Sequence, residues 1–391
     1  MRTFTCPHCA NLLFFENSAC VVCGTEVGID RTTRSMLRTT DSDRCANAEL
    51  AGCNWLAADG PLCGCCALTR TRPADEDVDA LEAFRAAEAA KRRLVYQLDD
   101  LGLPVTPRTA DLWHGLAFDL LSSTDRPVTT GHAGGVITID LAEGDDGFRE
   151  GLRARLAEPY RTLLGHFRHE IGHWYWDRLV ADAPAAFRDL FGDERADYQQ
   201  ALEKHYGSDA GPGWAEDHVS HYAAAHPWED WAETFAHLLH IRDTVQTAAA
   251  LGVLVAGTPI APHPGSQVDA VPEDRTEDVD ELIATWIPLS RALNQLNRSM
   301  GKDDLYPFAL APAVHTKLRF VGAIVTGNRT AVRGQGSGGP GSLSPWQMFE
   351  AARQGHSPRG EPQWLDDTPE TPVFHGERTP AVRVFSSRSR L

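Results

Sequence analysis

Near the middle of the 391-residue chain stands the stretch Gly165-His166-Phe167-Arg168-His169-Glu170-Ile171-Gly172-His173-Trp174-Tyr175-Trp176. Its centre is the pattern HExxH, whose two histidines lie on one face of a helix and can reach one metal ion. In this pattern the histidines bind zinc, and the glutamate takes a proton from the water that zinc activates. The stretch therefore predicts a helix with zinc ligands His169 and His173 and the general base Glu170.

A hydrolytic zinc site of this kind has three protein ligands and an open fourth position. The metzincin extension would place a glycine and a histidine where this chain has Trp176 and Leu179, so that class is excluded. The alternative is a carboxylate from a second helix. Residues 226–237 are the best candidate segment, because Pro227 suits a first helical turn and aromatic residues follow.

Glu229, Glu233 and His237 lie along one face of that second helix, at intervals of four residues. Because its remaining surface is aromatic, we expect the helix to be largely buried, and buried carboxylates need partners. We expect Glu233 to be the third zinc ligand, and Glu229 is the alternative.

Further polar residues near the motif are expected to support the ligands or the reaction. They orient a ligand histidine, stabilise the substrate oxyanion or simply pack. These candidates are His166, Asp177, Glu229, Asp230, His237 and Tyr222.

All nine cysteines fall within the first 66 residues of the chain. Two CxxC pairs separated by ten residues can complete one tetrahedral four-thiolate site, which favours a structural zinc ion over a redox pair. The ligands of this first site are Cys6, Cys9, Cys20 and Cys23.

A second set of cysteines has looser spacing and predicts a second structural zinc site. Cys65 is an odd ninth thiol, which can also replace a neighbour as ligand. Metal binding would supply the folding free energy that so short a segment cannot obtain from its own core. The expected ligands are Cys45, Cys53, Cys63 and Cys66.

Net charge and composition exclude some classes of function. The formal net charge is −17 and the hydrophobic fraction is 42%, so we expect a globular protein without general nucleic-acid binding. The opening residues do not resemble a signal peptide, and no apolar run approaches the roughly 20 residues of a membrane-spanning helix. We therefore expect a cytoplasmic protein that does not bind membranes.

Three parts are expected along the chain: a zinc-ribbon module over 1–72, a zinc metallopeptidase domain over 76–326, and a disordered Gly/Pro/Ser/Arg-rich tail over 327–391. Apolar residues at helical spacing over 81–101 predict a helix, and the β-branched run at 136–140 predicts a strand. The fold class is therefore α+β, with a mainly helical catalytic domain and a small sheet.

With these motifs the chain resembles a bacterial family of zinc-binding metallopeptidases with an N-terminal zinc-ribbon domain. The resemblance rests on the motif stretch, on residues 229–233, and on the shorter runs 53–55, 130–132 and 304–308. It implies a gluzincin-like catalytic domain with a small sheet edge above the zinc cleft, and it implies no particular substrate.

The leading hypothesis is a zinc-dependent metallopeptidase that acts on a peptide or protein, with one catalytic and one or two structural zinc ions. The ribbon would brace the catalytic domain or dock a protein partner. Two alternatives are a non-enzymatic adaptor with a metallopeptidase-like platform and a zinc hydrolase of a non-peptide amide or ester. The adaptor is disfavoured because a degenerate platform is expected to lose its glutamate, and Glu170 is present.

Overall fold

The computed structural model describes residues 2–58, 60–124, 127–144, 162–181, 184–207, 213–255 and 278–334, the last seven of these by their backbone alone. The cysteine-rich segment, residues 2–72, contains two small antiparallel hairpins. The first pairs β1 (Phe4–Thr5) with β2 (Leu12–Leu13), and the second pairs β3 (Val27–Asp30) with β4 (Ser35–Arg38).

A four-stranded sheet follows, with the order β5-β6-β8-β7. The strands β5 (Thr69–Thr71), β6 (Ala117–Leu121) and β8 (Val136–Asp140) are parallel, and β7 (Gly131–Ala133) joins β8 in antiparallel direction. The strand predicted at 136–140 is thus confirmed. The outer strand β5 comes directly from the cysteine-rich segment, so that segment completes the sheet of the helical part.

Helices form the rest of the described chain. The helix predicted over 81–101 is observed as α1, whose N-cap Asp77 accepts a hydrogen bond from the Ala80 amide at 3.1 Å. The helical elements are α1 (Val78–Asp100), η1 (Cys66–Leu68), η2 (Leu141–Gly144), α3 (Leu163–Leu179), α4 (Ala185–Phe191), α5 (Tyr198–Gly207), α6 (Trp214–Asp217), η3 (Tyr222–Ala225), α7 (Pro227–Ala250), α8 (Val279–Ser299) and α9 (Pro312–Gly334).

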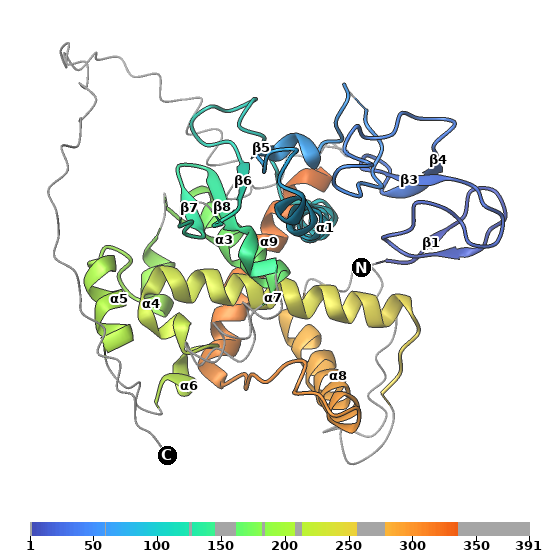
Figure 1. Cartoon of the computed structure of the whole chain (residues 1–391). Coiled ribbons are helices and arrows are strands. Elements are labelled where there is room, and N and C mark those ends of the chain that lie inside the picture. The colour runs from blue at the N-terminus through green and yellow to red at the C-terminus, as the bar shows by residue number, and fades with distance from the viewer. Residues whose placement is uncertain are drawn as a thin grey trace, which may run out of the picture. The chain divides into compact units, whose positions relative to one another are not determined.

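Helices α3 and α7 pack directly on each other, and α7 crosses the middle of the helical part in Figure 1. They approach closely at Gly172, where an added Cβ would lie 3.1 Å from the Cα of Ala232. Trp231 donates its indole N–H to the Gly172 carbonyl at 2.8 Å. The small residues Gly172 and Ala232 let the two helices pack closely, and this contact sets the crossing of the helices and hence the turn of α7 that faces the HExxH motif.

The start of α7 follows from its sequence. His226 is the N-cap, and its ring nitrogen accepts the Trp228 amide at 3.1 Å. Pro227 occupies the first helical turn, as predicted, because its missing N–H needs no partner there.

The cysteine-rich segment packs on α1 through aromatic rings and ion pairs. The rings of Phe4, Phe15 and Trp55 surround Tyr96 at centroid distances of 5.2–6.5 Å. Arg31 forms a two-pronged ion pair with Asp99, at 2.7 and 2.8 Å. The segment and the helical part thus share one buried core.

The α+β class is confirmed, with one change at the C-terminal end. Helix α9 continues to Gly334, so the expected disordered tail does not begin at 327. The remainder of that tail, 335–391, lies outside the described residues.

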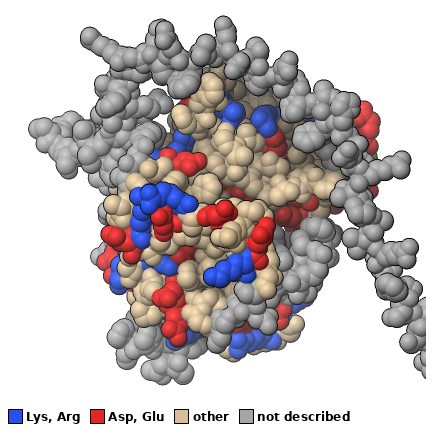
Figure 2. Space-filling model, turned by 90° about the vertical axis from the view of Figure 1, so that its left-hand side faces the viewer, with Lys and Arg blue, Asp and Glu red and all other residues tan. Residues whose placement is uncertain are grey.

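Within the described ranges, no helix is both long and apolar enough to cross a membrane. Figure 2 shows one face of the molecule, on which Lys and Arg side chains alternate with Asp and Glu. That face therefore carries no continuous basic surface of the kind that binds nucleic acid.

Candidate metal centre and active-site cavity

The two motif histidines lie where the sequence placed them, on one face of α3. Thr162 caps this helix by accepting the Gly165 amide at 3.0 Å. The Nε2 atoms of His169 and His173 are 3.1 Å apart. Both rings therefore direct a nitrogen to the same point.

The carboxylate that meets them belongs to Glu229. Its Oε2 lies 3.0 Å from His169 Nε2 and 3.4 Å from His173 Nε2. Glu229 is 1% exposed, and within the described part of the chain this oxygen has no hydrogen-bond partner. Burial works against ionisation, but the charges and contacts of His173 and His169 together outweigh it and hold the pKa of Glu229 well below its usual range. His169, His173 and Glu229 form the His/Glu cluster.

Glu233, the expected third ligand, contacts the other ring nitrogen of His169, Nδ1, which faces away from the cluster. Its Oε1 lies 2.7 Å from His169 Nδ1, and Ser220 donates its hydroxyl to the other oxygen at 2.6 Å. The geometry thus favours Glu229 as the third ligand, which reverses the expected order. The physical reason is the crossing at Gly172, which brings the first turn of α7 to the two Nε2 atoms.

Glu170 lines a cavity of about 510 Å³ that borders the cluster. Its side chain shares this wall with His169 and Glu233, so the cavity reaches the base and the metal-facing ring together. Burial raises the pKa of Glu170, and this effect exceeds the opposing one of the two histidine charges.

Three of the supporting candidates also line this cavity: His166, Tyr222 and His237. His166 pairs through Nδ1 with the buried Glu143. The ring of Tyr222 lies 5.8 Å from that of His169. His237 Nδ1 lies 2.7 Å from the Tyr306 hydroxyl, and burial lowers the pKa of His237 to about 4.

Two other candidates lie elsewhere. Asp177 is exposed near the end of α3 and does not line the cavity. Asp230 pairs with Lys317 of α9 at 2.6 Å, so it anchors α9 to α7 and contacts neither ligand histidine. The ion-pair partners of Asp230 among the described residues are Lys317 and His218, so no observed contact supports a role for Asp230 in orienting a ligand histidine.

Sequence reasoning missed Tyr198 and Ser220, which hold the two carboxylates. Tyr198 of α5 donates its hydroxyl to Glu229 Oε1 at 2.6 Å, and this leaves Oε2 free to face the histidines. Neither residue belongs to a motif. For Ser220 the one available signal was that a buried Glu233 needs a hydrogen-bond donor, which a hydroxyl two positions before Tyr222 can supply.

Both cysteine sets converge as predicted. In the first cluster, Cys6 and Cys23 are 3.7 Å apart between sulfur atoms, and Cys9 and Cys20 are 3.6 Å apart. A tetrahedron with zinc–sulfur bonds near 2.3 Å separates its sulfur atoms by about 3.8 Å, so these distances suit zinc.

The second cluster consists of Cys45, Cys53, Cys63 and Cys66, all of them buried. Backbone N–H groups donate to its sulfurs, at 3.3 Å to Cys45 and 3.4 Å to Cys63. Cys65 is fully buried beside this cluster and is not one of its four convergent sulfurs. Burial raises the pKa of the Cys65 thiol, which makes it an inert packing group.

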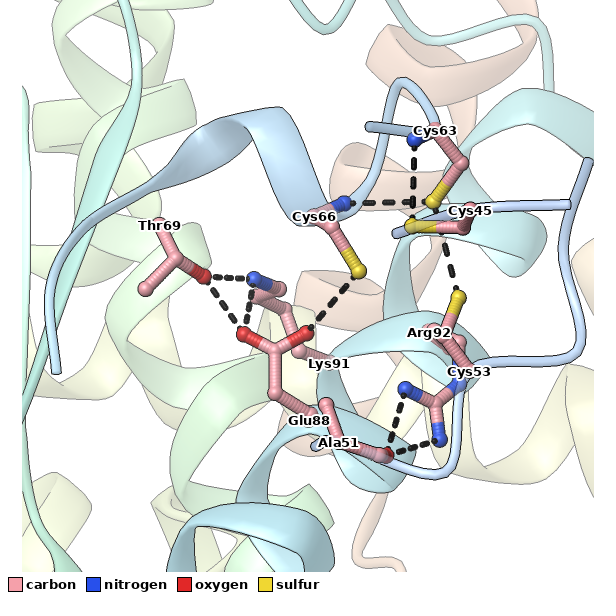
Figure 3. A network of polar contacts seen from close by, with 9 residues as sticks. All are labelled: Cys45, Ala51, Cys53, Cys63, Cys66, Thr69, Glu88, Lys91 and Arg92. Atoms are coloured by element: carbon pink, nitrogen blue, oxygen red, sulfur yellow. Dashed lines mark hydrogen bonds and ion pairs between the residues drawn. The ribbon is translucent and has the colours of Figure 1, made fainter. Parts of the chain in front are cut away.

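A buried polar network joins the second cluster to α1 (Figure 3). Glu88 lies with one carboxylate oxygen 3.7 Å from Cys66 Sγ and the other 2.6 Å from Lys91 Nζ. Thr69, the first residue of β5, contacts both Glu88 and Lys91. The side chains of Glu88 and Lys91 are fully buried, so the pair connects the cluster, the sheet and the helical core.

Comparison with known proteins identifies the family of the chain. The family described as "Putative zinc-binding metallo-peptidase" matches residues 80–324, and a zinc-ribbon domain matches residues 3–77. The chain therefore belongs to this family of zinc-binding metallopeptidases and carries an N-terminal zinc ribbon, in agreement with the resemblance seen in the sequence.

Relatives described as uncharacterised proteins come from Mycobacterium bovis and Mycobacterium tuberculosis. Each is 50% identical over 334 residues, which covers 83% of this chain and 95% of the relative. No solved structure matches the chain.

Proposed function

We propose that the protein is a gluzincin-like, zinc-dependent peptidase whose catalytic zinc is held by His169, His173 and Glu229. The observation that carries this proposal is the meeting of three ligand atoms at 3.0–3.4 Å from one another. Tetrahedral zinc with ligands at about 2.0–2.1 Å separates them by about 3.3 Å. A buried carboxylate oxygen without a hydrogen bond is also what a metal ligand leaves behind.

Glu233 acts on the ligand His169 rather than on the metal. A carboxylate on Nδ1 fixes the tautomer and the ring orientation, so that Nε2 presents its lone pair to the metal. Hydrogen bonding to His169 and Ser220 outweighs the effect of burial and lowers the pKa of Glu233 to about 2. It therefore remains a carboxylate at neutral pH.

When bound, zinc would lower the pKa of the attacking water and polarise the substrate carbonyl. Glu170 accepts the proton of that water as it attacks, then delivers the proton to the departing amine. The raised pKa of Glu170 suits a group that must both take and give a proton. Its place on the cavity wall puts it beside a bound substrate.

Tyr222 is the best placed donor for the oxyanion that develops on the substrate carbonyl. It lines the cavity next to His169, whereas His237 Nδ1 is already engaged with Tyr306. A fixed hydroxyl stabilises the charge because it needs no reorganisation during the reaction.

The sheet provides a place for an extended peptide backbone. In the sheet of the described residues β7 is the edge strand opposite β5; it contacts α3, and Thr130 directly before it lines the cavity. The unpaired edge of such a strand can accept a peptide as an additional strand. This favours a peptide over a small amide or ester as substrate.

The test compares wild type with Glu170→Gln in metal content and in cleavage of a peptide library. We expect the variant to keep its zinc and to lose cleavage by about 10²–10⁴-fold, the usual contribution of a general base. Equal cleavage by both proteins would contradict the mechanism. Metal counting on His169→Ala provides the second check, with three zinc ions per chain falling to two.

A further inference from the structure

The cavity beside the His/Glu cluster is larger than the chemistry alone requires. Its volume of about 510 Å³ lies within the range of about 300–1,000 Å³ that ligand sites occupy. Aromatic rings from separate elements form its wall: Tyr206 of α5, Trp214 of α6, Tyr222 of η3 and Phe308 before α9. Segments far apart in the sequence thus contribute one uncharged surface.

We call the two small, mostly buried apolar residues of the lining, Val219 and Ala236, the floor of the cavity. Val219 is 2% exposed and Ala236 is 8% exposed, and both line it. The ring of Phe308 stands edge-on to His237 at a centroid distance of 4.5 Å. Small side chains at the floor and rings at the wall leave room for one bulky group.

Three ionisable groups at the wall, Arg168, His166 and Glu233, are already paired. Arg168, the one Lys or Arg on the cavity wall among the described residues, binds Asp243 at 2.7 Å and Gln97 at 3.1 Å. His166 is paired with Glu143, and both oxygens of Glu233 are engaged.

The two deeper histidines carry no charge at neutral pH. Burial lowers the pKa of His237 to about 4 and that of His240 to about 3. Among the described residues of the wall, an acidic side chain of a substrate would therefore meet no unpaired Lys or Arg, and a basic one would meet the carboxylate of Glu170.

We infer that this cavity is the specificity pocket of the proposed peptidase and that it binds a bulky uncharged side chain, aromatic or large aliphatic, next to the scissile bond. This inference rests on the proposed function. An aromatic side chain gains from burial and from ring contacts, whereas a charged one loses its hydration without gaining a partner.

The first test is cleavage of a peptide library, randomised on both sides of the scissile bond, by the zinc-loaded full-length protein. We expect Phe, Tyr, Trp or Leu to exceed Asp and Lys at one of the two flanking positions by at least about tenfold. Cleavage with no preference, or with a charged residue preferred, would overturn the inference and leave the proposed function standing.

The second test does not depend on turnover. Glu170→Gln protein is titrated with capped fluorescent peptides that differ only in one residue, Phe, Leu, Ala, Asp or Lys, and binding is read by anisotropy. Tighter binding of the Phe and Leu peptides supports the pocket even if wild type cleaves nothing, in which case only the proposed function fails. Equal binding of all five contradicts the pocket.

Ala236→Leu identifies the pocket by filling its floor. We expect the ratio of Phe-peptide to Ala-peptide affinity to fall about tenfold in the Glu170→Gln background, because the added isobutyl group occupies the space. Ala249→Leu is the matched control, since Ala249 lies on the same helix, is also 8% exposed and does not line the cavity. Metal content is measured for both. An equal ratio in the two variants places the binding side chain elsewhere.

Discussion

The second cysteine cluster and the His/Glu cluster are both buried, and they differ in number of ligands and in access. Four sulfurs close the cysteine cluster on all sides, with backbone N–H groups directed at two of them. The His/Glu cluster has three ligand atoms and borders a cavity. A closed set of four leaves no position for a reactant, whereas three ligands beside a cavity do. Access, rather than burial, separates the structural site from the candidate catalytic one.

The two clusters also differ in what builds them. The cysteines come from turns of one short segment, so their convergence depends on the metal itself. The His/Glu cluster comes from two long helices that pack around Gly172 and would hold their places without an ion. Metal loss should therefore unfold one region and merely inactivate the other.

The largest expected effect comes from breaking the second cysteine cluster with Cys63→Ser. Structural zinc in such sites contributes about 10 kcal/mol or more to folding. We expect the cysteine-rich segment to unfold, with loss of hydrogen-exchange protection there and one zinc ion fewer. His169→Ala is the contrasting variant, which should also lose one zinc ion but keep its melting temperature. Equal unfolding in both variants would break the comparison.

A smaller effect is expected from Lys91→Met, which removes one partner of the buried pair behind the cysteine cluster. An uncompensated buried Glu88 costs about 3–5 kcal/mol. Chemical denaturation should report this loss. The double variant Glu88→Gln/Lys91→Met is expected to recover much of it, because no charge is then left unpaired. No recovery would mean that the pair acts through direct support of Cys66.

Next in size is the difference between Glu229→Gln and Glu233→Gln at the His/Glu cluster. A group that orients a ligand histidine typically changes metal affinity by about 10–100-fold, and we expect Glu233→Gln to fall in this range. Glu229→Gln should weaken zinc binding further. Competition with a calibrated chelator measures both. The opposite order would restore Glu233 as the ligand that the sequence favoured.

The smallest expected effect on stability comes from the contact between strands β5 and β6, where Arg70 pairs with Asp119 at 2.9 Å. Burial opposes ionisation of Asp119, but the hydrogen bonds from Arg70 and Thr71 and the charge of Arg70 together outweigh it and lower the pKa of Asp119 below the usual 3.8. The pair therefore stabilises the fold above pH 3.8, and this contribution is lost as pH falls through the lowered pKa.

Asp119→Asn should accordingly cost less than about 1 kcal/mol at pH 7, since Arg70 is half exposed. Unfolding curves at pH 7 and pH 3 measure this, and the difference from wild type should shrink at the lower pH. A constant difference would point to packing rather than charge.

Much of the secondary structure was predictable from local sequence patterns. The alternation and β-branching at 136–140 and the apolar stripe of α1 depend on neighbouring residues only, so they were visible in the chain. The tail boundary expected at 327 lies inside α9, because this helix continues to Gly334, into a segment whose Gly/Pro/Ser/Arg-rich composition suggested disorder. The aromatic cavity left no sequence signal, since Tyr206, Trp214 and Phe308 belong to separate elements.

The sequence by itself indicated both cysteine sets and the residues His169, Glu170 and His173, because the CxxC pairs and the HExxH spacing each place their members within one loop or one helix face. Only the tertiary structure decided which glutamate meets the histidines. Glu229 and Glu233 share one face of α7, and no local rule distinguishes them. The choice depends on how two helices cross, and that is set by the close packing of Gly172 against Ala232, two residues far apart in the chain.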